Sequence, residues 1–325
     1  MQKRKNCRYV LVSSCNRSGG LHLLSVDSYG GLRLIAQPCK GNVRGFAYFQ
    51  EDEDLYIARG NDIKILDFDL DFENPKFRSC EHGWFAADPV VDNYMFHDLL
   101  FSGDRLFVVV TRFNRVAIID CVTKERVGTL NIDGARMDMS HINSLCALPE
   151  GLLLSMFSFT GKKNLQPWRK KDGAIIKIPW DVVEGFSRSG KCVDTTKDIP
   201  PPMVSGLEQP HSFAVHQGWL YYCESFWHRV WRVPVAGGEA EFVYEFNKGY
   251  VRGLCVVGDI LLIGESCPEN HKQVPAHFLG SSKHALVHAL DLLGGDIVHT
   301  LDIPASAEIY HIAECPGAVV EKLPA

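Results

Sequence analysis

Four histidines and two arginines open six similar segments of the sequence. They are Arg44, His97, His141, His211, Arg252 and His311. Folding alone gives little reason to repeat cations at one point of a recurring unit, because burying charge is costly. Imidazole groups transfer protons near neutral pH and bind transition metals, whereas guanidinium groups bind carboxylates and phosphates. The recurrence therefore predicts a functional ring of cationic residues.

Three of these histidines, His97, His141 and His211, open consecutive segments. Together they could present three imidazoles to one divalent transition metal such as Mn, Fe or Zn, with His311 as a further ligand and other positions left for water or substrate. The sequence lacks the close histidine spacing that would identify a metal site locally. The alternative is a polar channel in which these side chains bind water and backbone groups.

Other polar residues are expected on the same face, where second strands return to the ring. The arginines suited to an anionic group of a substrate are Arg44, Arg252, Arg59 and Arg112. Their alternative role is ion pairing with the carboxylates of Glu224, Glu265 or Asp98. Glu224 and Glu265 are candidates for general acid and base, or for additional metal ligands. Asn143, two residues after His141, is a candidate for orienting a ligand.

Two insertions follow second strands and are expected over the same face. The first, residues 157–173, carries Trp168, which is suited to cover a ligand, and the second spans residues 266–283. Long loops that gather at one face are often functional. The alternative is that both are solvated loops.

These residues must be positioned by a repeated hairpin. The segment from Gln209 to Glu224 contains two apolar runs around a Gln217-Gly218 turn, a pattern typical of a β-hairpin. Six such units, each with about four strands, predict an all-β fold, a six-bladed β-propeller. The N- and C-terminal segments are expected to complete the last blade jointly, and residues 1–325 to form a single domain.

Composition restricts the partners. The 325 residues are 46% hydrophobic and 22% charged, with a formal net charge of −5 and a pI near 6.2. This balance argues against nucleic acid and against an anionic membrane as the main partner. No signal peptide and no apolar run of membrane-spanning length is evident. Eleven cysteines without paired spacing indicate reduced thiols and a cytoplasmic location.

The segment Gln209-Pro-His-Ser212, with the following Trp219-Leu-Tyr-Tyr222 and Glu224-Ser225, resembles a poorly characterised family of six-bladed propellers, a conserved hypothetical domain with a Pro-His-Ser strand motif. The resemblance extends to His141-Ile-Asn143 and to Lys171-Asp-Gly-Ala174. Phe213, Ala214 and Glu224 depart from the family pattern. The family implies the fold and no secure activity. More distantly, the sequence is similar to metal-centred, gluconolactonase-like propellers, although its histidine-rich ring looks more like that of propeller lyases.

These features favour a metal-dependent enzyme, a lyase, isomerase or hydrolase, that acts on a small anionic polar substrate such as an acidic sugar at the mouth of the central channel. One alternative is a propeller that binds a sugar or metabolite without converting it. The other is a protein-interaction scaffold, which would carry an apolar patch outside the channel.

Overall fold

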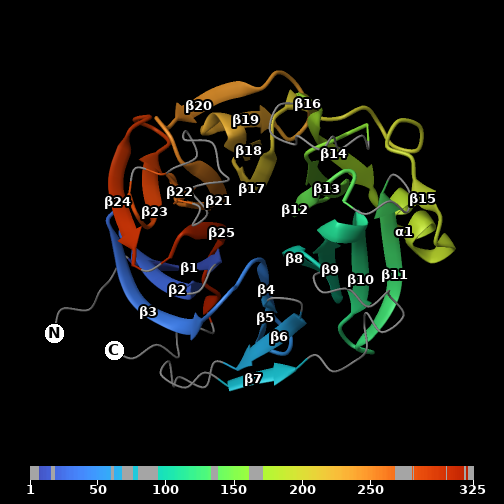
Figure 1. Ribbon diagram of the computed structural model, residues 1–325, viewed down its shortest axis with the longest axis horizontal. Helices are drawn as coiled ribbons and strands as arrows, with labels where there is room; N and C mark the ends of the chain where they lie inside the picture. The colour runs from blue at the N-terminus through green and yellow to red at the C-terminus, as the bar shows by residue number, and fades with distance from the viewer. Residues whose placement is uncertain are drawn as a thin grey trace. The chain divides into compact units, whose positions relative to one another are not determined.

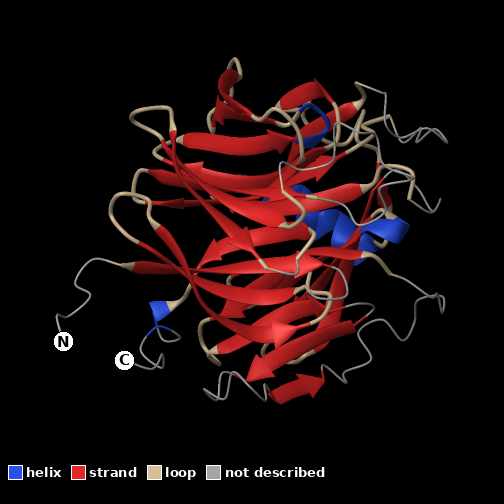
Figure 2. Ribbon diagram, turned by 60° about the vertical axis from the view of Figure 1, so that its left-hand side comes forward, coloured by secondary structure: helices blue, strands red, loops and turns tan. Residues whose placement is uncertain are grey.

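The computed structural model describes residues 7–15, 19–59, 62–67, 76–79, 94–132, 138–160, 171–267, 280, 282–304, 306–317 and 320. Strands dominate the regular structure (Figure 2) and form six sheets. The fold is the six-bladed β-propeller that the repeat predicts. Within the described residues, no helix is both long and apolar enough to cross a membrane.

The chain divides into two compact units, each described here by itself. Unit 1 comprises Met1–Arg44, Leu66–Lys76 and Phe213–Ala325, and unit 2 comprises Gly45–Ile65 and Phe77–Ser212. The single domain expected from the sequence stays a prediction.

Unit 1 holds most of three four-stranded antiparallel sheets. The first contains β25 (Glu308–Glu314), β1 (Arg8–Cys15), β2 (Gly20–Val26) and β3 (Leu32–Lys40). The second contains β17 (Pro210–His216), β18 (Trp219–Glu224), β19 (Arg229–Pro234) and β20 (Glu241–Glu245). The third contains β21 (Tyr250–Val257), β22 (Ile260–Ser266), β23 (Ala285–Asp291) and β24 (Ile297–Ile303). In Figure 1, the red β25 lies beside the blue β1, which confirms the predicted joint closure by the two ends of the chain.

Unit 2 holds most of the other three sheets. One contains β4 (Phe46–Phe49), β5 (Asp54–Arg59), β6 (Asp62–Asp67) and β7 (Lys76–Ser79). The next contains β8 (Phe96–Ser102), β9 (Arg105–Val110), β10 (Arg115–Asp120), β11 (Glu125–Ile132) and β15 (Cys192–Val193), of which β15 is parallel to β11. The last contains β12 (Ile142–Leu148), β13 (Gly151–Met156), β14 (Gly173–Pro179) and β16 (Val204–Leu207).

A helix that the hairpin pattern does not indicate follows β14. Helix α1 (Trp180–Ser189) begins after Pro179 and ends at Gly190, whose φ of 66° is the left-handed conformation that glycine adopts readily. The buried Val183 joins the hydrophobic cluster formed by strands of unit 2. The helix therefore adds to the core of unit 2.

The first strand of each sheet in chain order is called the inner strand, because in propellers this strand lines the axis. In the sheet that both ends of the chain complete, the inner strand is β25. Three inner strands share one irregularity, a β-bulge at which two residues are skipped in the pairing. The skipped pairs are His97-Asp98, Asn143-Ser144 and Arg252-Gly253. In β25 the pairing shifts around Tyr310. His97, Asn143, Arg252 and Tyr310 are therefore at equivalent positions of their inner strands. The sequence spacing placed His141 and His311 at these positions, and it was wrong by two residues for His141 and by one residue for His311.

Hydroxyl groups at the ends of second strands tie neighbouring blades together. The Thr111 hydroxyl donates to the carbonyl oxygen of Ile142 at 2.6 Å, and the Ser225 hydroxyl donates to that of Val251 at 2.6 Å. In each case the acceptor lies on the inner strand of the next blade, directly before or near the bulge. These hydrogen bonds hold the bulges of adjacent inner strands in place.

Candidate functional site

A single turn of unit 2 positions the loop that leads into β12. The turn Thr111–Phe113 follows β9 and ends at Asn114, which is fully buried and has a left-handed backbone. The Asn114 side-chain oxygen accepts hydrogen bonds from the backbone N–H groups of Ser140 and His141, at 3.0 and 3.3 Å. The carbonyl oxygen of Arg112 accepts one from the N–H of Asp138 at 2.8 Å. The loop is thereby held by the backbone N–H groups of Asp138, Ser140 and His141.

Asp138 and His141 form a close carboxylate–imidazole pair. Nδ1 of His141 lies 2.7 Å from Oδ1 of Asp138, and the side chains are 14% and 22% exposed. Because an ionised carboxylate only accepts hydrogen bonds, Nδ1 carries the proton and Nε2 is the basic nitrogen. Both residues have positive φ, 53° and 49°, a strained conformation for residues other than glycine that is common at functional sites.

Aromatic rings fix the orientation of His141. Its ring stacks on Phe157, with 4.3 Å between centroids, and meets the His97 ring edge-on at 5.5 Å. The Phe157 N–H donates to the carbonyl oxygen of Ser140 at 3.0 Å, which ties the first residue of the insertion 157–173 to the same loop. The structure therefore brings His97 and His141 together, as predicted.

Two polar atoms near this pair are buried and have no hydrogen-bond partner within the described residues. One is Nε of Arg112 and the other is Oδ1 of Asn143, whose amide nitrogen donates to the carbonyl oxygen of His141 at 2.9 Å. An unsatisfied buried donor or acceptor costs roughly 1–3 kcal/mol unless a ligand or water meets it. Arg112 and Asn143, both predicted from the sequence, are thus suited to bind an anion and to accept a hydrogen bond.

Two of the predicted metal ligands, His211 and His311, make other contacts within the described residues. The ring of His211 packs edge-on against Phe157 at 5.0 Å, and its Nδ1 lies 3.0 Å from the carbonyl oxygen of Gln209. His311 belongs to unit 1, where its N–H donates to the Ser13 hydroxyl at 3.0 Å. In the part of the chain that the structure describes, no group of three or more His, Cys, Asp or Glu side chains could hold a metal ion.

In unit 1, the buried Arg252 has a partly exposed counterion, Glu308, which the sequence did not reveal. Its guanidinium pairs with Glu308, its Nε donates to the carbonyl oxygen of Ile309 at 2.5 Å, and it lies 3.6 Å from the centroid of the Tyr310 ring. Burial acts to lower the pKa of Arg252, but Tyr310 and Glu308 outweigh it and raise the pKa above its ordinary value. Burial also raises the pKa of Tyr310, against the influence of Arg252. Arg252 is therefore held as a cation within the protein.

The predicted acid and base, Glu224 and Glu265, are themselves buried, and both have hydrogen-bond partners. The Glu224 carboxylate accepts from the indole N–H of Trp231 at 3.1 Å. Oε2 of Glu265 lies 3.0 Å from Nε2 of His288, and both side chains are almost fully buried. These contacts join neighbouring strands within a blade, and a catalytic role for the two carboxylates stays a prediction.

Of the remaining predicted residues, Arg44 and Arg59 lie over aromatic rings, and Trp168 is outside the description. The Arg44 guanidinium lies 5.8 Å from the Tyr310 ring centroid in unit 1, and that of Arg59 lies 4.7 Å from the Phe77 ring centroid in unit 2. Trp168 and most of both insertions lie outside the described residues. Where the first insertion begins and ends, Asp172 accepts hydrogen bonds from the hydroxyls of Ser158 and Thr160, at 2.6 and 2.8 Å.

Asp138 and Asn114 were missed because neither lies in the hairpin pattern. A signal for Asn114 does exist, since Thr111-Arg-Phe-Asn-Arg-Val116 and Ser225-Phe-Trp-His-Arg-Val230 both follow a second strand, begin with a hydroxyl residue and end in Arg-Val. Both stretches form a short 3-10 turn that ends in a left-handed residue. For Asp138, the only local signal is its position three residues before His141.

Solved structures with similar folds are distant in sequence. A chain of a nidogen/laminin complex is 12% identical, with a TM-score of 0.58 over 94% of this chain and 97% of its own. A luciferin-regenerating enzyme is 12% identical, with a TM-score of 0.51 over 82% of this chain and 77% of its own. Regucalcin, a calcium-binding protein from Agrobacterium tumefaciens, is 12% identical, with a TM-score of 0.50 over 82% of this chain and 75% of its own. At these identities the likeness shows the fold alone.

Sequence comparison gives a family and no close relative. The family model described as "Domain of unknown function (DUF4915)" matches residues 5–323. No curated protein is significantly similar to the chain in sequence.

Proposed function

The chain belongs to the DUF4915 family, and we propose that it is an enzyme that uses His141 as a general base on a small anionic polar substrate, such as an acidic sugar. The observation that carries the proposal is the 2.7 Å contact between His141 and Asp138, in a loop that has strained backbone at both residues. A carboxylate partner fixes the tautomer of an imidazole and stabilises the imidazolium that forms when Nε2 takes a proton.

The proposed chemistry needs few groups besides this pair. Nε2 of His141 takes the proton from the carbon next to the substrate carboxylate, and the electrons of that C–H bond move onto the carboxylate. The Arg112 guanidinium stabilises the additional negative charge, and Oδ1 of Asn143 accepts a hydrogen bond from a substrate hydroxyl. Transfer of a proton from solvent water to the other face, with release of the first proton from His141 to solvent, gives an isomerase. If the His141 imidazolium instead protonates a hydroxyl on the neighbouring carbon, that hydroxyl leaves as water and the reaction is that of a lyase.

The test follows proton transfer directly. The protein is incubated in D2O with glucuronate, galacturonate and gluconate, and the signal of the proton next to the carboxylate is followed by ¹H NMR. We expect deuterium exchange or conversion of at least one acid, lowered at least 100-fold in both His141→Gln and Asp138→Asn. The matched control is His284→Gln, because His284 has a similar contact with Asp302, at 3.0 Å, on the exposed surface of unit 1.

Each other result contradicts the proposal in its own way. If an acid raises the melting temperature without exchange or conversion, the protein is the non-catalytic binder. If exchange occurs equally in His141→Gln, another residue is the base. If none of the acids binds or reacts, the proposed substrate class is wrong.

A transition metal, expected from the histidines of the sequence, is a separate proposal that the His141 mechanism does not require. It is tested by metal analysis of native protein purified without chelator, beside a His97→Ala/His211→Ala variant. One equivalent of metal that is lost in the variant would support it. We further propose a cytoplasmic location, which the ten described cysteines support, since all are thiols.

A further inference from the structure

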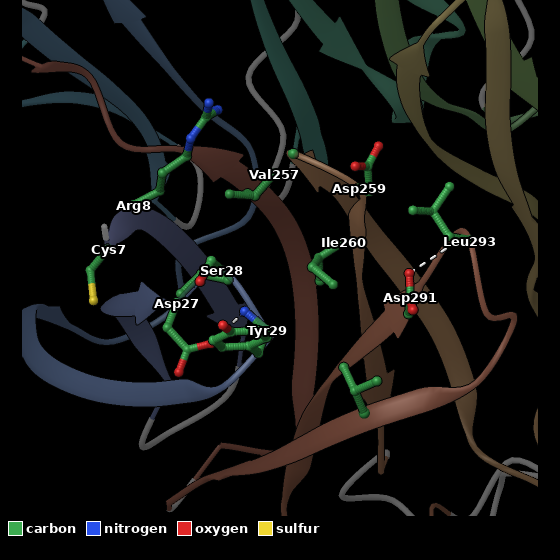
Figure 3. A pocket seen from close by; sticks show the side chains of 13 residues that line it. Cys7, Arg8, Asp27, Ser28, Tyr29, Val257, Asp259, Ile260, Asp291 and Leu293 are labelled. Carbon is green, nitrogen blue, oxygen red and sulfur yellow. Dashed lines mark hydrogen bonds between the residues drawn. The ribbon is translucent and has the colours of Figure 1, made fainter. Parts of the chain in front are cut away.

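Unit 1 has a surface pocket at the opposite end of the inner strand from the bulge. The pocket has a volume of about 880 Å³ and is lined by hairpin turns of two sheets (Figure 3). Val257 and Asp259, at the β21–β22 turn, lie on its wall, whereas Arg252 is five residues earlier on β21. At about 3.3 Å per residue, this separation is roughly 17 Å. The pocket is therefore distinct from the residues considered above.

Two large, exposed apolar side chains line this pocket. Tyr29 is 85% exposed and Leu293 is 82% exposed, and both line the pocket together with Val298. Exposed apolar side chains that gather at a pocket indicate a binding surface, whereas single ones are common anywhere. The protein-interaction alternative of the sequence analysis predicts such a patch.

Tyr29 and Leu293 belong to turns that are ordered by internal hydrogen bonds. Oδ1 of Asp27 accepts hydrogen bonds from the N–H groups of Tyr29 and Gly31, at 2.8 and 2.9 Å, and Oδ1 of Asp291 accepts one from Leu293 at 3.0 Å. Gly30 has a φ of 82°, and a Cβ there would lie 2.6 Å from Val298, so the turn fits closely onto the neighbouring sheet. Preformed turns lower the entropy lost when a partner binds.

The charge of the pocket is negative. Three carboxylates line it, those of Asp27, Asp259 and Asp291. Arg8 is the basic residue among the lining residues that the structure describes, and it pairs with Glu314 at 3.2 Å. Figure 3 shows the carboxyl groups of Asp27, Asp259 and Asp291 spread around the apolar Ile260. An occupant should therefore carry positive charge next to an apolar group.

We propose that this pocket binds an extended segment of a partner protein in which a Lys or Arg lies next to a large apolar side chain. A second pocket, of about 590 Å³, shares Cys7 and Arg8 with the first, which gives a peptide room to continue. A patch of three exposed apolar side chains is small for the apolar centre of a stable dimer, which argues against a second copy of this chain as the occupant.

The test selects ligands without assuming a sequence. A display library of random twelve-residue peptides is selected on the full-length protein, and the consensus peptide is synthesised with a fluorophore. We expect a consensus with Lys or Arg within three positions of Leu, Ile, Phe or Met. Its Kd, measured by fluorescence anisotropy, should rise at least tenfold in a Tyr29→Ser/Leu293→Ser variant and should also rise with salt.

Val122→Ser is the matched control, because Val122 is exposed and belongs to unit 2. It should bind the peptide as the native protein does. Peptides without basic residues, or peptides that bind the double variant equally well, would overturn the proposal. So would a native dimer that the double variant converts to monomer, or tighter peptide binding after deletion of residues 2–6, whose Lys3-Arg4-Lys5 would then be the natural occupant. None of these results depends on the His141 activity.

Discussion

The guanidinium carbon of Arg252 lies 3.6 Å from the centre of the Tyr310 ring, and each residue occupies the irregular point of its own inner strand. This stacking joins the first and third sheets of unit 1 where both depart from regular pairing. A residue chosen from the sequence as a substrate ligand thus holds two blades together.

Replacement of Arg252 by Met should therefore destabilise the protein. The change leaves the partly exposed Glu308 carboxylate without its guanidinium partner, and we expect the free energy of unfolding to fall by about 3 kcal/mol in urea denaturation. Arg232→Met is the control, because Arg232 also lies over a ring, that of Trp219, and pairs with Glu241, but on the surface. Its effect should stay below about 1 kcal/mol. Equal effects would show that burial of Arg252 contributes nothing.

His22 should make stability depend on pH. Burial lowers its pKa to about 4, and its Nε2 lies 2.9 Å from the Ser14 hydroxyl. The unfolded chain, with a pKa near 6.5, binds the proton more readily. The contribution of neutral His22 to the free energy of unfolding is therefore complete above about pH 6.5 and is lost as the pH falls toward 4. It amounts to roughly 3 kcal/mol.

Urea denaturation between pH 4 and 7 measures this effect. Part of the slope of stability against pH should disappear in His22→Gln, and it should remain in His284→Gln, which alters an exposed histidine. An unchanged slope in His22→Gln would mean that His22 does not titrate in this way.

Gly249 should not accept alanine. Its φ is 92°, and an added Cβ would lie 2.4 Å from Cγ of Glu265. Because Glu265 is held by His288, we expect Gly249→Ala to cost about 2–4 kcal/mol. Gly218→Ala separates strain from crowding, since Gly218 has a φ of 80° but open space around it. Gly218→Ala should lower the free energy of unfolding by only about 1 kcal/mol. Similar losses in both variants would mean that crowding against Glu265 does not destabilise Gly249→Ala.

Thr111→Val should weaken the connection between two blades of unit 2. It removes the 2.6 Å hydrogen bond to the Ile142 carbonyl while keeping the shape of the side chain. We expect a loss of about 1–2 kcal/mol, recovered in Thr111→Ser, which keeps the hydroxyl. If Thr111→Ser is as unstable as Thr111→Val, the methyl group rather than the hydrogen bond is important.

The fold followed from the sequence because hairpins have a local signature. Apolar runs around Gln217-Gly218 and Gly258-Asp259 predict antiparallel pairs, and the structure confirms them as β17 with β18 and β21 with β22. Joint closure followed from strands without partners at both ends of the chain. Helix α1 was missed although Pro179 and Gly190 mark its two ends.

The candidate site was harder to predict because bulges break the period of two on which strand reasoning depends. A bulge inserts residues, so positions counted from His97 fall on His141 in sequence but on Asn143 in structure. Arg112, which the repeat does indicate, contacts the loop of His141 through its backbone, whereas Asp138 lies outside the repeat. Ion pairs such as Arg252 with Glu308 join residues 56 positions apart, and no local pattern reveals them.

The joint closure also constrains the order in which the protein can form during synthesis. Strands β1, β2 and β3 are complete by residue 40, but their inner strand, β25, ends at Glu314. These three strands therefore wait, with an unpaired edge at β1, until synthesis has passed β25. During that time the edge is exposed to pairing with other chains, so this blade is open to misassembly in a nascent molecule.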